Sequence, residues 1–332
     1  YKLDNLVCLV DNNKRQLDGA VADVMSHGKG IGAKFDAFGW HVIDVKDGND
    51  VEQISAAIAE AYTVKNQPTC LILNTVKGKG YEYAMKSPDV YHGVTSFDVE
   101  TGKTPASGPS FSSVFAENLT ELAKEDETIC AITAAMKNGT GLQGFADRFP
   151  DRFFDVGIAE ETAVALASGI AKGGGKPVYG VYSSFIQRTY DQISQDLCID
   201  GNPATIVVYT GSVFGMTDVT HLGLQDIPML SNIPGLVYLA PTTKEEYLSM
   251  LDWSVEQKEM PVAIKLPGGD MISDGREVKK DWSQLNTYEV TEKGSKIALI
   301  GLGTFYFLAL QTAEMLEKKG IHATVINPYY IT

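Results

Sequence analysis

Short apolar runs alternate with amphipathic segments in the first part of the chain. The runs at 6–10, 41–45 and 69–74 are largely apolar, and a segment with helical periodicity lies near 51–65. The residues at 47–50 that precede this segment are turn-forming and helix-capping types. Apolar strands separated by helices indicate a parallel sheet that is covered on both faces.

The same alternation resumes after a break and continues to the end of the chain. Strands are predicted at 129–132, 178–182, 205–209, 237–239, 262–265, 297–300 and 323–326. Helices are predicted around 114–122 and at 161–172, 185–199 and 306–319. Tyr190 lies in the third of these helices, and we expect it in the core because aromatic residues near strand-to-helix junctions usually pack inward.

Two polar stretches divide these elements into domains. Residues 95–112 are rich in Gly, Pro, Ser and Thr, which is typical of a linker, and the second polar stretch spans 270–284. We therefore predict one α/β domain in 1–94, a second in 113–283 and the beginning of a third in 284–332. A single strand–helix–strand unit cannot bury its own core, so we expect the third domain to continue beyond Thr332. The first residue is Tyr1 rather than Met, so we also expect residues before it.

Composition and charge narrow the classes of partner. The 332 residues are 44% hydrophobic and 21% charged, which is typical of a globular protein. No apolar run approaches the length of about 18 residues that a membrane helix needs. The net charge of -14 excludes nucleic acid and anionic membranes as general partners. The four cysteines form no CxxC pair, and Cys8, Cys70 and Cys130 lie in or beside apolar runs, where buried structural thiols are expected. These features favour a cytoplasmic protein.

A cluster of side-chain oxygens follows the first predicted strand. Asp11, Asn12 and Asn13 are consecutive, and such hard oxygen ligands are the kind that Mg²⁺ prefers. An Asx-type turn after a strand explains the same residues equally well.

Two acidic residues open the predicted helix at 161–172. Glu160 and Glu161 follow an apolar strand, and acidic residues in a first helical turn complement the helix dipole. This structural explanation is sufficient for Glu161. Glu160 is a candidate proton-transfer residue, because a partly buried carboxyl group with a raised pKa suits that chemistry.

Several stretches together resemble the thiamine-diphosphate-dependent transketolase superfamily, and within it the 1-deoxyxylulose-5-phosphate synthases. The resemblance rests on Phe154-Asp155-Val156-Gly157-Ile158-Ala159-Glu160, Val181-Tyr182-Ser183-Ser184-Phe185-Ile186-Gln187-Arg188, Lys77-Gly78-Lys79-Gly80, Tyr91-His92-Gly93-Val94 and Gly215-Met216-Thr217-Asp218-Val219-Thr220-His221. It covers essentially the whole chain. The implied fold is α/β, with two parallel-sheet domains of three layers each and the start of a C-terminal domain. The implied assembly is a homodimer with thiamine diphosphate and Mg²⁺ as cofactors.

The resemblance also implies roles for individual residues. Glu160, His92 and His221 would be catalytic, with Glu160 at the pyrimidine N1′ of the cofactor. The other cofactor residues would be Phe185 on the aminopyrimidine, Tyr182 lining the site, Lys77 and Asn13. Asn13 would bind Mg²⁺ through its side chain and Arg15 through its backbone carbonyl, and the GDG half of this motif would lie before Tyr1. Taken without the resemblance, both histidines are more typical of structural positions.

Several positions differ from the synthase pattern where that family binds substrate. Arg188 matches, and it would lie near the substrate. The family's two phosphate-binding arginines fall on Thr210 and Lys265, and a site aspartate falls on Thr217. A hydroxyl and a point charge thus replace guanidinium groups that can bind a phosphate in a bidentate way. The cofactor residues match while acceptor recognition differs.

The expected reaction joins a two-carbon unit to an aldehyde acceptor. A synthase-like reaction with a 2-oxoacid donor, pyruvate, is the first expectation. Transfer of a ketol unit from a ketose, as in transketolases, is the second. A catalytically silent or regulatory subunit that binds the cofactor is an alternative of another class, and retention of Glu160, Phe185 and His221 speaks against it.

Overall fold

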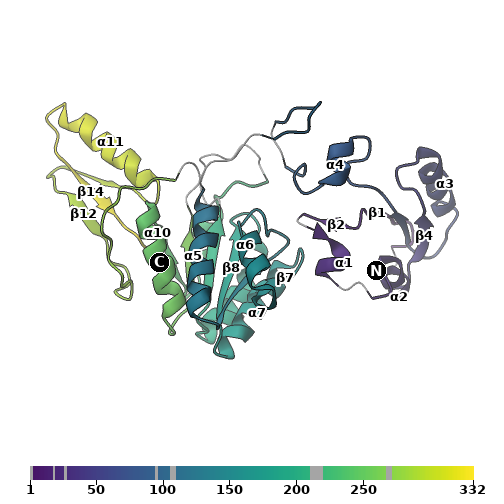
Figure 1. Ribbon diagram of the computed structural model, residues 1–332, viewed down its shortest axis with the longest axis horizontal. Coiled ribbons are helices and arrows are strands. Elements are labelled where there is room, and N and C mark those ends of the chain that lie inside the picture. Colours follow the sequence, from purple (N-terminus) through teal and green to yellow (C-terminus); the bar gives the residue numbers. More distant parts are fainter. Residues whose placement is uncertain are drawn as a thin grey trace. The chain divides into compact units, whose positions relative to one another are not determined.

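The computed structural model describes residues 3–17, 19–25, 28–93, 96–104, 110–209, 220–266 and 271–332. The chain divides into two compact units, Tyr1–Ser107 and Gly108–Thr332. Figure 1 shows the elements of both units along the chain. No helix in the described ranges is both long enough and apolar enough to cross a membrane.

The first unit is built on a parallel sheet of three strands. Their order is β1 (Val7–Asp11), β5 (Thr69–Leu73) and β4 (His41–Val45). Helix α3 (Val51–Ala61) begins where predicted, because Asp50 caps it by accepting from the backbone N–H groups of Glu52 and Gln53. The short elements of this unit are β2 (Arg15–Gln16), β3 (Gly19–Ala20), α1 (Val21–Val24), α2 (Ile31–Ala37) and α4 (Glu82–Lys86).

Helices cover both faces of this sheet. Val45 and Leu71 point to one face, where they pack against Ala57 and Ala61 of α3. On the opposite face α2 lies close to the strands, since a side chain at Gly32 would meet Val42 at 3.4 Å. The predicted parallel sheet with covered faces is confirmed for this unit.

The second unit contains a parallel sheet of six strands in the order β10-β11-β9-β8-β6-β7. The strands are β6 (Ile129–Thr133), β7 (Phe153–Asp155), β8 (Lys176–Tyr182), β9 (Thr205–Tyr209), β10 (Val237–Leu239) and β11 (Val262–Lys265). The helices are α5 (Phe111–Glu125), α6 (Gln143–Arg148), α7 (Glu160–Lys172), α8 (Tyr190–Gln192), α9 (Asp226–Leu230) and α10 (Lys244–Glu256).

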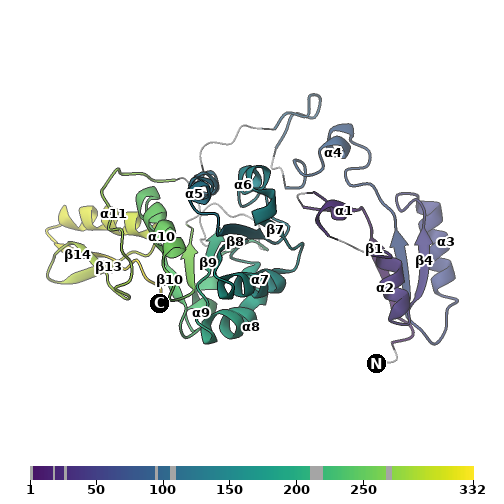
Figure 2. The ribbon, with the colours of Figure 1, turned by 60° about the horizontal axis from the view of Figure 1, so that its bottom comes forward.

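The core of this unit has two halves, one on each face of the sheet. Phe115 of α5, Phe145 of α6 and Tyr247 of α10 pack on one face. Val164 of α7 and Leu230 of α9 pack on the other (Figure 2). Alternate residues of β6, β8, β9, β10 and β11 contribute to the two halves, which explains why these strands are largely apolar. The predicted three-layer α/β fold is confirmed.

The predicted helix at 185–199 is wrong in its detail. The structure has a 3₁₀ helix at Ile186–Thr189, then α8, then a π-helix at Ile193–Ile199. The carbonyl of Asp196 in the π-helix accepts from Ser168 Oγ at 2.7 Å and from Asn202 Nδ2 at 3.1 Å. These distant donors favour the wider turn, because they satisfy a carbonyl that would otherwise bond within the helix.

Tyr190 is not in the core, contrary to prediction. It is 41% exposed, and its hydroxyl donates to Asn232 Oδ1 at 2.6 Å. The break between the 3₁₀ turn and α8 turns this residue outward, so helical periodicity through the whole segment gives the wrong face.

A small sheet forms the end of the chain. Its order is β12 (Glu289–Glu292), β14 (Ala323–Asn327) and β13 (Ile297–Ile300), with α11 (Phe305–Glu317) between β13 and β14. β13 and β14 are parallel, as the predicted strand–helix–strand unit requires. β12 pairs antiparallel with β14 and was not predicted.

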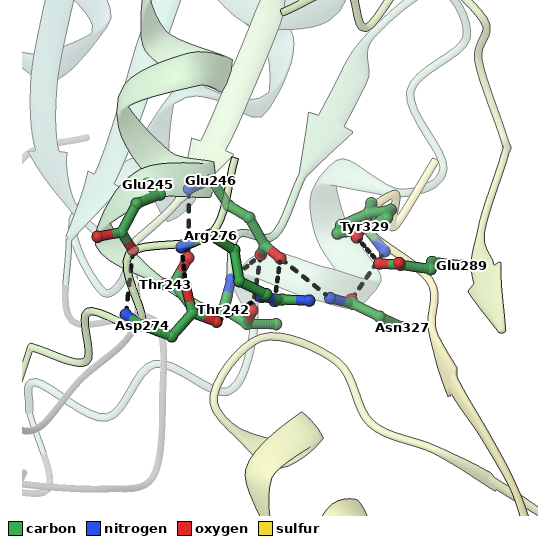
Figure 3. Close-up of polar contacts among 9 residues, drawn as sticks. All are labelled: Thr242, Thr243, Glu245, Glu246, Asp274, Arg276, Glu289, Asn327 and Tyr329. Atoms are coloured by element: carbon green, nitrogen blue, oxygen red, sulfur yellow. Dashed lines mark hydrogen bonds and ion pairs between the residues drawn. The ribbon is translucent and has the colours of Figure 1, made fainter. Parts of the chain in front are cut away.

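The segment that leads into this sheet is held by the first turn of α10 (Figure 3). The buried Glu246 carboxylate accepts from Thr242 N at 2.7 Å and from Thr242 Oγ1 at 2.6 Å. Its other oxygen accepts from Arg276 Nη2 at 3.4 Å and from Asn327 Nδ2 at 3.5 Å. One carboxylate therefore links α10 to the segment before β12 and to the end of β14.

Candidate active site

The candidate site of the second unit lies where the parallel strands end. β7 ends at Asp155, whose carboxylate accepts from Ala135 N at 2.8 Å and from Gly157 N at 2.9 Å. Gly157 has φ +73°, a conformation that side chains other than glycine rarely adopt. This tight turn places Glu160 at the first residue of α7.

Glu160 is a buried acid with a cationic partner. Its side chain is 4% exposed, and Oε2 accepts from Arg188 Nη1 at 2.9 Å. The Arg188 side chain is 50% exposed, and its Nε lies 3.9 Å from Glu161 Oε1. The hydrogen bond from Arg188 to Glu160 and their charge attraction raise the pKa of Arg188 further. The guanidinium therefore stays charged and connects a buried acid to an exposed one.

Three aromatic rings group beside this ion pair. The rings of Tyr182 and Phe185 are stacked, with centroids 5.7 Å apart and an interplanar angle of 18°. The imidazole of His221 meets Phe185 edge-on at 5.3 Å and Tyr182 at 6.2 Å. A turn at the end of β8 sets this arrangement, since Phe185 N donates to Tyr182 O at 2.9 Å. His221 Nδ1 also lies 2.7 Å from Thr220 Oγ1.

Buried hydroxyl groups without partners lie on β8 and the turn that follows it. Within the described part of the chain, the hydroxyls of Tyr179, Ser183 and Ser184 have no hydrogen-bond partner. Burial raises the pKa of Tyr179 well above its ordinary value, and the nearby charge of Glu160 adds to this. An unpaired buried hydroxyl is costly, so these groups favour a ligand that supplies the missing hydrogen bonds.

Lys265, the expected phosphate-binding cation, forms a buried ion pair within the protein. Its Nζ lies 2.5 Å from Asp226 Oδ2, and the two side chains are 11% and 0% exposed. Tyr238 donates to the same carboxylate oxygen at 2.5 Å. Burial lowers the pKa of Lys265, against the attraction of Asp226. Thr210 and Thr217 lie outside the described residues.

The candidate residues of the first unit form two separate contacts. Lys77 Nζ lies 3.0 Å from His92 Nδ1, and Arg15 Nη2 lies 2.6 Å from Asp89 Oδ1. Asn13 Oδ1 accepts from Arg15 N at 2.9 Å, which is the Asx-type turn that the sequence left open. Across the described ranges, no group of three or more His, Cys, Asp or Glu side chains could hold a metal ion. The Asn13 amide oxygen and the backbone carbonyl oxygens have second lone pairs that can still accept an ion.

Sequence reasoning overlooked Asp155 and Asp226. Asp155 lay in the quoted motif without a role, although an acid at the end of an apolar strand is a signal for a turn that needs backbone N–H partners. Asp226 gave no signal of its own, because its partner Lys265 is distant in the sequence.

Comparison with known proteins identifies the family. Three family models match consecutive parts of the chain: the thiamine diphosphate binding domain of transketolase at residues 1–104, its pyrimidine binding domain at 107–271 and its C-terminal domain at 286–332. The chain belongs to the transketolase family. The resemblance stated from the sequence motifs is thereby confirmed.

Curated members of the transketolase family resemble the chain over most of its length. It is 40% identical over 316 residues to the 1-deoxy-D-xylulose-5-phosphate synthase of Natranaerobius thermophilus, which is 94% of this chain and 49% of that protein. It is 39% identical over 303 residues to synthase 1 of Geobacter sulfurreducens, covering 90% of this chain and 47% of that one. The chain thus spans about half the length of the curated relatives it matches.

Solved transketolase structures share the fold. The Pichia stipitis transketolase in complex with sedoheptulose-7-phosphate has a TM-score of 0.59 at 17% identity, over 99% of this chain and 61% of that one. A split-gene transketolase described as an inactive β4 tetramer has a TM-score of 0.57 at 24% identity, over 68% of this chain and 73% of that one.

Proposed function

We propose that this chain is part of a thiamine-diphosphate-dependent carboligase of the 1-deoxy-D-xylulose-5-phosphate synthase type. The enzyme would add a two-carbon unit from pyruvate to an aldehyde. The observation that carries the proposal is the buried Glu160 at the start of α7, next to the turn that bears Tyr182, Phe185 and Arg188. The synthase names of relatives near 40% identity support the same reaction.

The residues of the second unit fit an aminopyrimidine. Phe185 offers an aromatic face for a flat heterocycle, and Glu160 offers a carboxylate shielded from water. The unpartnered hydroxyls of Ser183 and Tyr179 leave hydrogen bonds for a ligand to complete. When bound, the cofactor would supply the thiazolium carbon at which the donor reacts. Glu160 would hold a proton at N1′, and His221 and His92 would exchange protons with substrate oxygens.

We extend the proposal to the metal and to the domains. The Asn13 side-chain oxygen and the Arg15 carbonyl would bind Mg²⁺, and Lys77 would bind the diphosphate. The diphosphate-binding part would span 1–94, a linker 95–112, the pyrimidine-binding domain 113–283 and the start of the C-terminal domain 284–332. We further propose a cytoplasmic homodimer, acting in isoprenoid biosynthesis without nucleic acid or membrane partners.

We propose an altered acceptor site for this enzyme. Lys265 is already paired with Asp226 and largely buried, so part of its charge is neutralised before a phosphate arrives. Thr210 and Thr217 supply hydroxyls where the synthase pattern has charged side chains. Arg188 would then be the main cation near the substrate, although it is shared with Glu160.

A second function is ketol transfer of the transketolase type. A third is a silent subunit, which the inactive tetramer formed by a split-gene transketolase brings into consideration. The test is a calorimetric titration of the full-length protein with thiamine diphosphate and Mg²⁺, followed by assays with pyruvate or xylulose phosphate as donor. Binding with turnover of pyruvate supports the synthase type. Turnover of the ketose alone supports transketolase, and binding without turnover supports the silent subunit.

A further inference from the structure

Two cysteines lie directly opposite each other in the sheet of the first unit. Cys8 of β1 and Cys70 of β5 are register partners in a parallel pair of strands. Adjacent strands run about 4.8 Å apart, and register partners project to the same face of the sheet. That spacing lies within the Cα separation of about 4.4–6.8 Å that a disulfide requires.

The two thiols share the face that α2 covers. Leu71, next to Cys70, points to the α3 side, so Cys70 points the opposite way. Burial raises the pKa of Cys70 to about 11. The charge of Cys8 and a hydrogen bond with its side chain add to this rise. The shared face and the register of the two strands place these thiols side by side in the sheet.

Exposure distinguishes the two cysteines. Cys70 is fully buried on the central strand, with 0% of its surface exposed. Cys8 is half-buried on β1 in this structure. Of the two thiols, that of Cys8 is therefore the more accessible to a small oxidant here, and Cys70 is the neighbour that can complete the reaction.

We propose that Cys8 and Cys70 form a reversible redox pair that closes into a cross-strand disulfide. A hydroperoxide oxidises the Cys8 thiol to a sulfenic acid and is itself reduced to water or an alcohol. The Cys70 thiol then attacks the Cys8 sulfur, the S–S bond forms, and the sulfenic oxygen leaves as water with the Cys70 proton. A dithiol reductant reopens the bond by exchange and leaves as its own disulfide.

The position of the pair gives the disulfide a structural consequence. β1 leads directly into Asn12, whose backbone N–H donates to Leu73 O at 2.8 Å and whose Nδ2 donates to Asn74 Oδ1 at 3.0 Å. Hydrogen bonds thus hold β1 and β5 together at this end. The disulfide would join them covalently and close a long loop of chain, which stabilises the first unit against unfolding. This inference does not depend on the proposed reaction.

The test uses the full-length protein, oxidised with hydrogen peroxide, alkylated and digested for mass spectrometry. We expect a linked peptide pair containing Cys8 and Cys70, which disappears after treatment with dithiothreitol. Cys8→Ser and Cys70→Ser should each abolish it. Cys198→Ser is the matched control and should leave it unchanged, because Cys198 lies in the π-helix of the other unit.

A trapping experiment tests the order of events. In Cys70→Ser, dimedone should label Cys8, since the sulfenic acid has lost its partner. If that variant does not fold, peptide mapping of the wild-type protein alone decides. Recovery of both cysteines as free, alkylated thiols after oxidation would overturn the proposal, as would oxidation of Cys8 to sulfinic acid without any linked peptide.

Discussion

Arg188 donates a hydrogen bond from Nη1 to Oε2 of Glu160 at 2.9 Å, although Glu160 is buried and Arg188 is half exposed. The carboxylate proposed to meet the cofactor therefore already has a cationic partner in this structure. Any ligand group that binds Oε2 must therefore share this oxygen with the Arg188 guanidinium or displace it.

Replacing Glu160 with Gln should remove proton exchange at C2 of bound thiamine diphosphate in the full-length protein. The amide cannot take or give a proton at N1′, so we expect a loss of about 10²–10⁴-fold or more. Exchange is measured by NMR after mixing with deuterated water, and circular dichroism shows whether the fold is kept. Glu161→Gln is the matched control and should exchange normally. Near-normal exchange in Glu160→Gln would remove this residue from the mechanism.

Replacing Arg188 with Ala should slow that exchange. The hydrogen bond from Arg188 Nη1 to Glu160 Oε2 fixes the orientation of the carboxylate, so its loss leaves the carboxylate less well placed for N1′. We expect a smaller loss than in Glu160→Gln, because the acid itself remains. Arg188→Lys should restore part of the rate because it keeps a charged donor. A rate equal to that of the wild type in Arg188→Ala would show that Arg188 does not position Glu160.

The parallel strands could be predicted because their pattern is local. The strands at 205–209 and 262–265 begin and end where the apolar runs do, since both faces of each strand are buried by helices. The division of the segment 185–199 into a 3₁₀ helix, α8 and a π-helix could not be predicted. Its π-turn depends on Ser168 and Asn202, which reach the Asp196 carbonyl from other elements.

The candidate site, too, could be predicted from the sequence only in part. Spacing alone did not bring His221 to Tyr182 and Phe185, and it was the resemblance to a known family that suggested this group. The pairing of Lys265 with Asp226 lay beyond both approaches, because it joins side chains 39 residues apart. Contacts of this kind depend on the fold, and no pattern along the chain encodes them.

Glu246 should make the stability of the second unit fall as pH rises. Burial raises its pKa, while hydrogen bonds from Thr242 and the charge of Arg276 lower it, and the nearby Glu289 adds to the rise. A carboxyl group whose pKa is raised in the folded state stabilises the fold at pH values below 4.5, its ordinary pKa. This contribution is lost as the pH rises through the folded-state pKa. The free energy of unfolding of the wild type should therefore decrease, relative to Glu246→Gln, over that range.

Urea denaturation at several pH values measures this effect. Trp253 lies on α10 and Trp282 on the segment before β12, so tryptophan fluorescence reports on the region. Glu245→Gln is the control. Partial burial raises the pKa of Glu245, but hydrogen bonds from Ser273 and from the backbone of Asp274 and Gly275 lower it overall. Wild type should gain stability over this control as pH rises towards 4.5. Equal slopes for the two variants would refute the assignment.

The acceptor preference should differ from that of the relatives named as synthases. A Lys265 side chain that turned to a phosphate would give up its buried ion pair with Asp226, and breaking such a pair costs about 3–5 kcal/mol. Each charge-assisted bond to a phosphate that is missing costs about 1.5–3 kcal/mol. We therefore expect kcat/KM for glyceraldehyde phosphate to be lower by roughly 10–100-fold than for an unphosphorylated aldehyde, with the donor step intact.

Two substitutions test the physical reason for this preference. Thr210→Arg should improve the phosphorylated acceptor, because it supplies a guanidinium that is not committed elsewhere. Lys265→Arg alone should not, since the new side chain would still face Asp226. Pyruvate consumption without acceptor serves as the control and should be the same in all three proteins. Efficient turnover of glyceraldehyde phosphate by the wild type, with no gain from Thr210→Arg, would show that the Asp226–Lys265 pair does not limit phosphate binding.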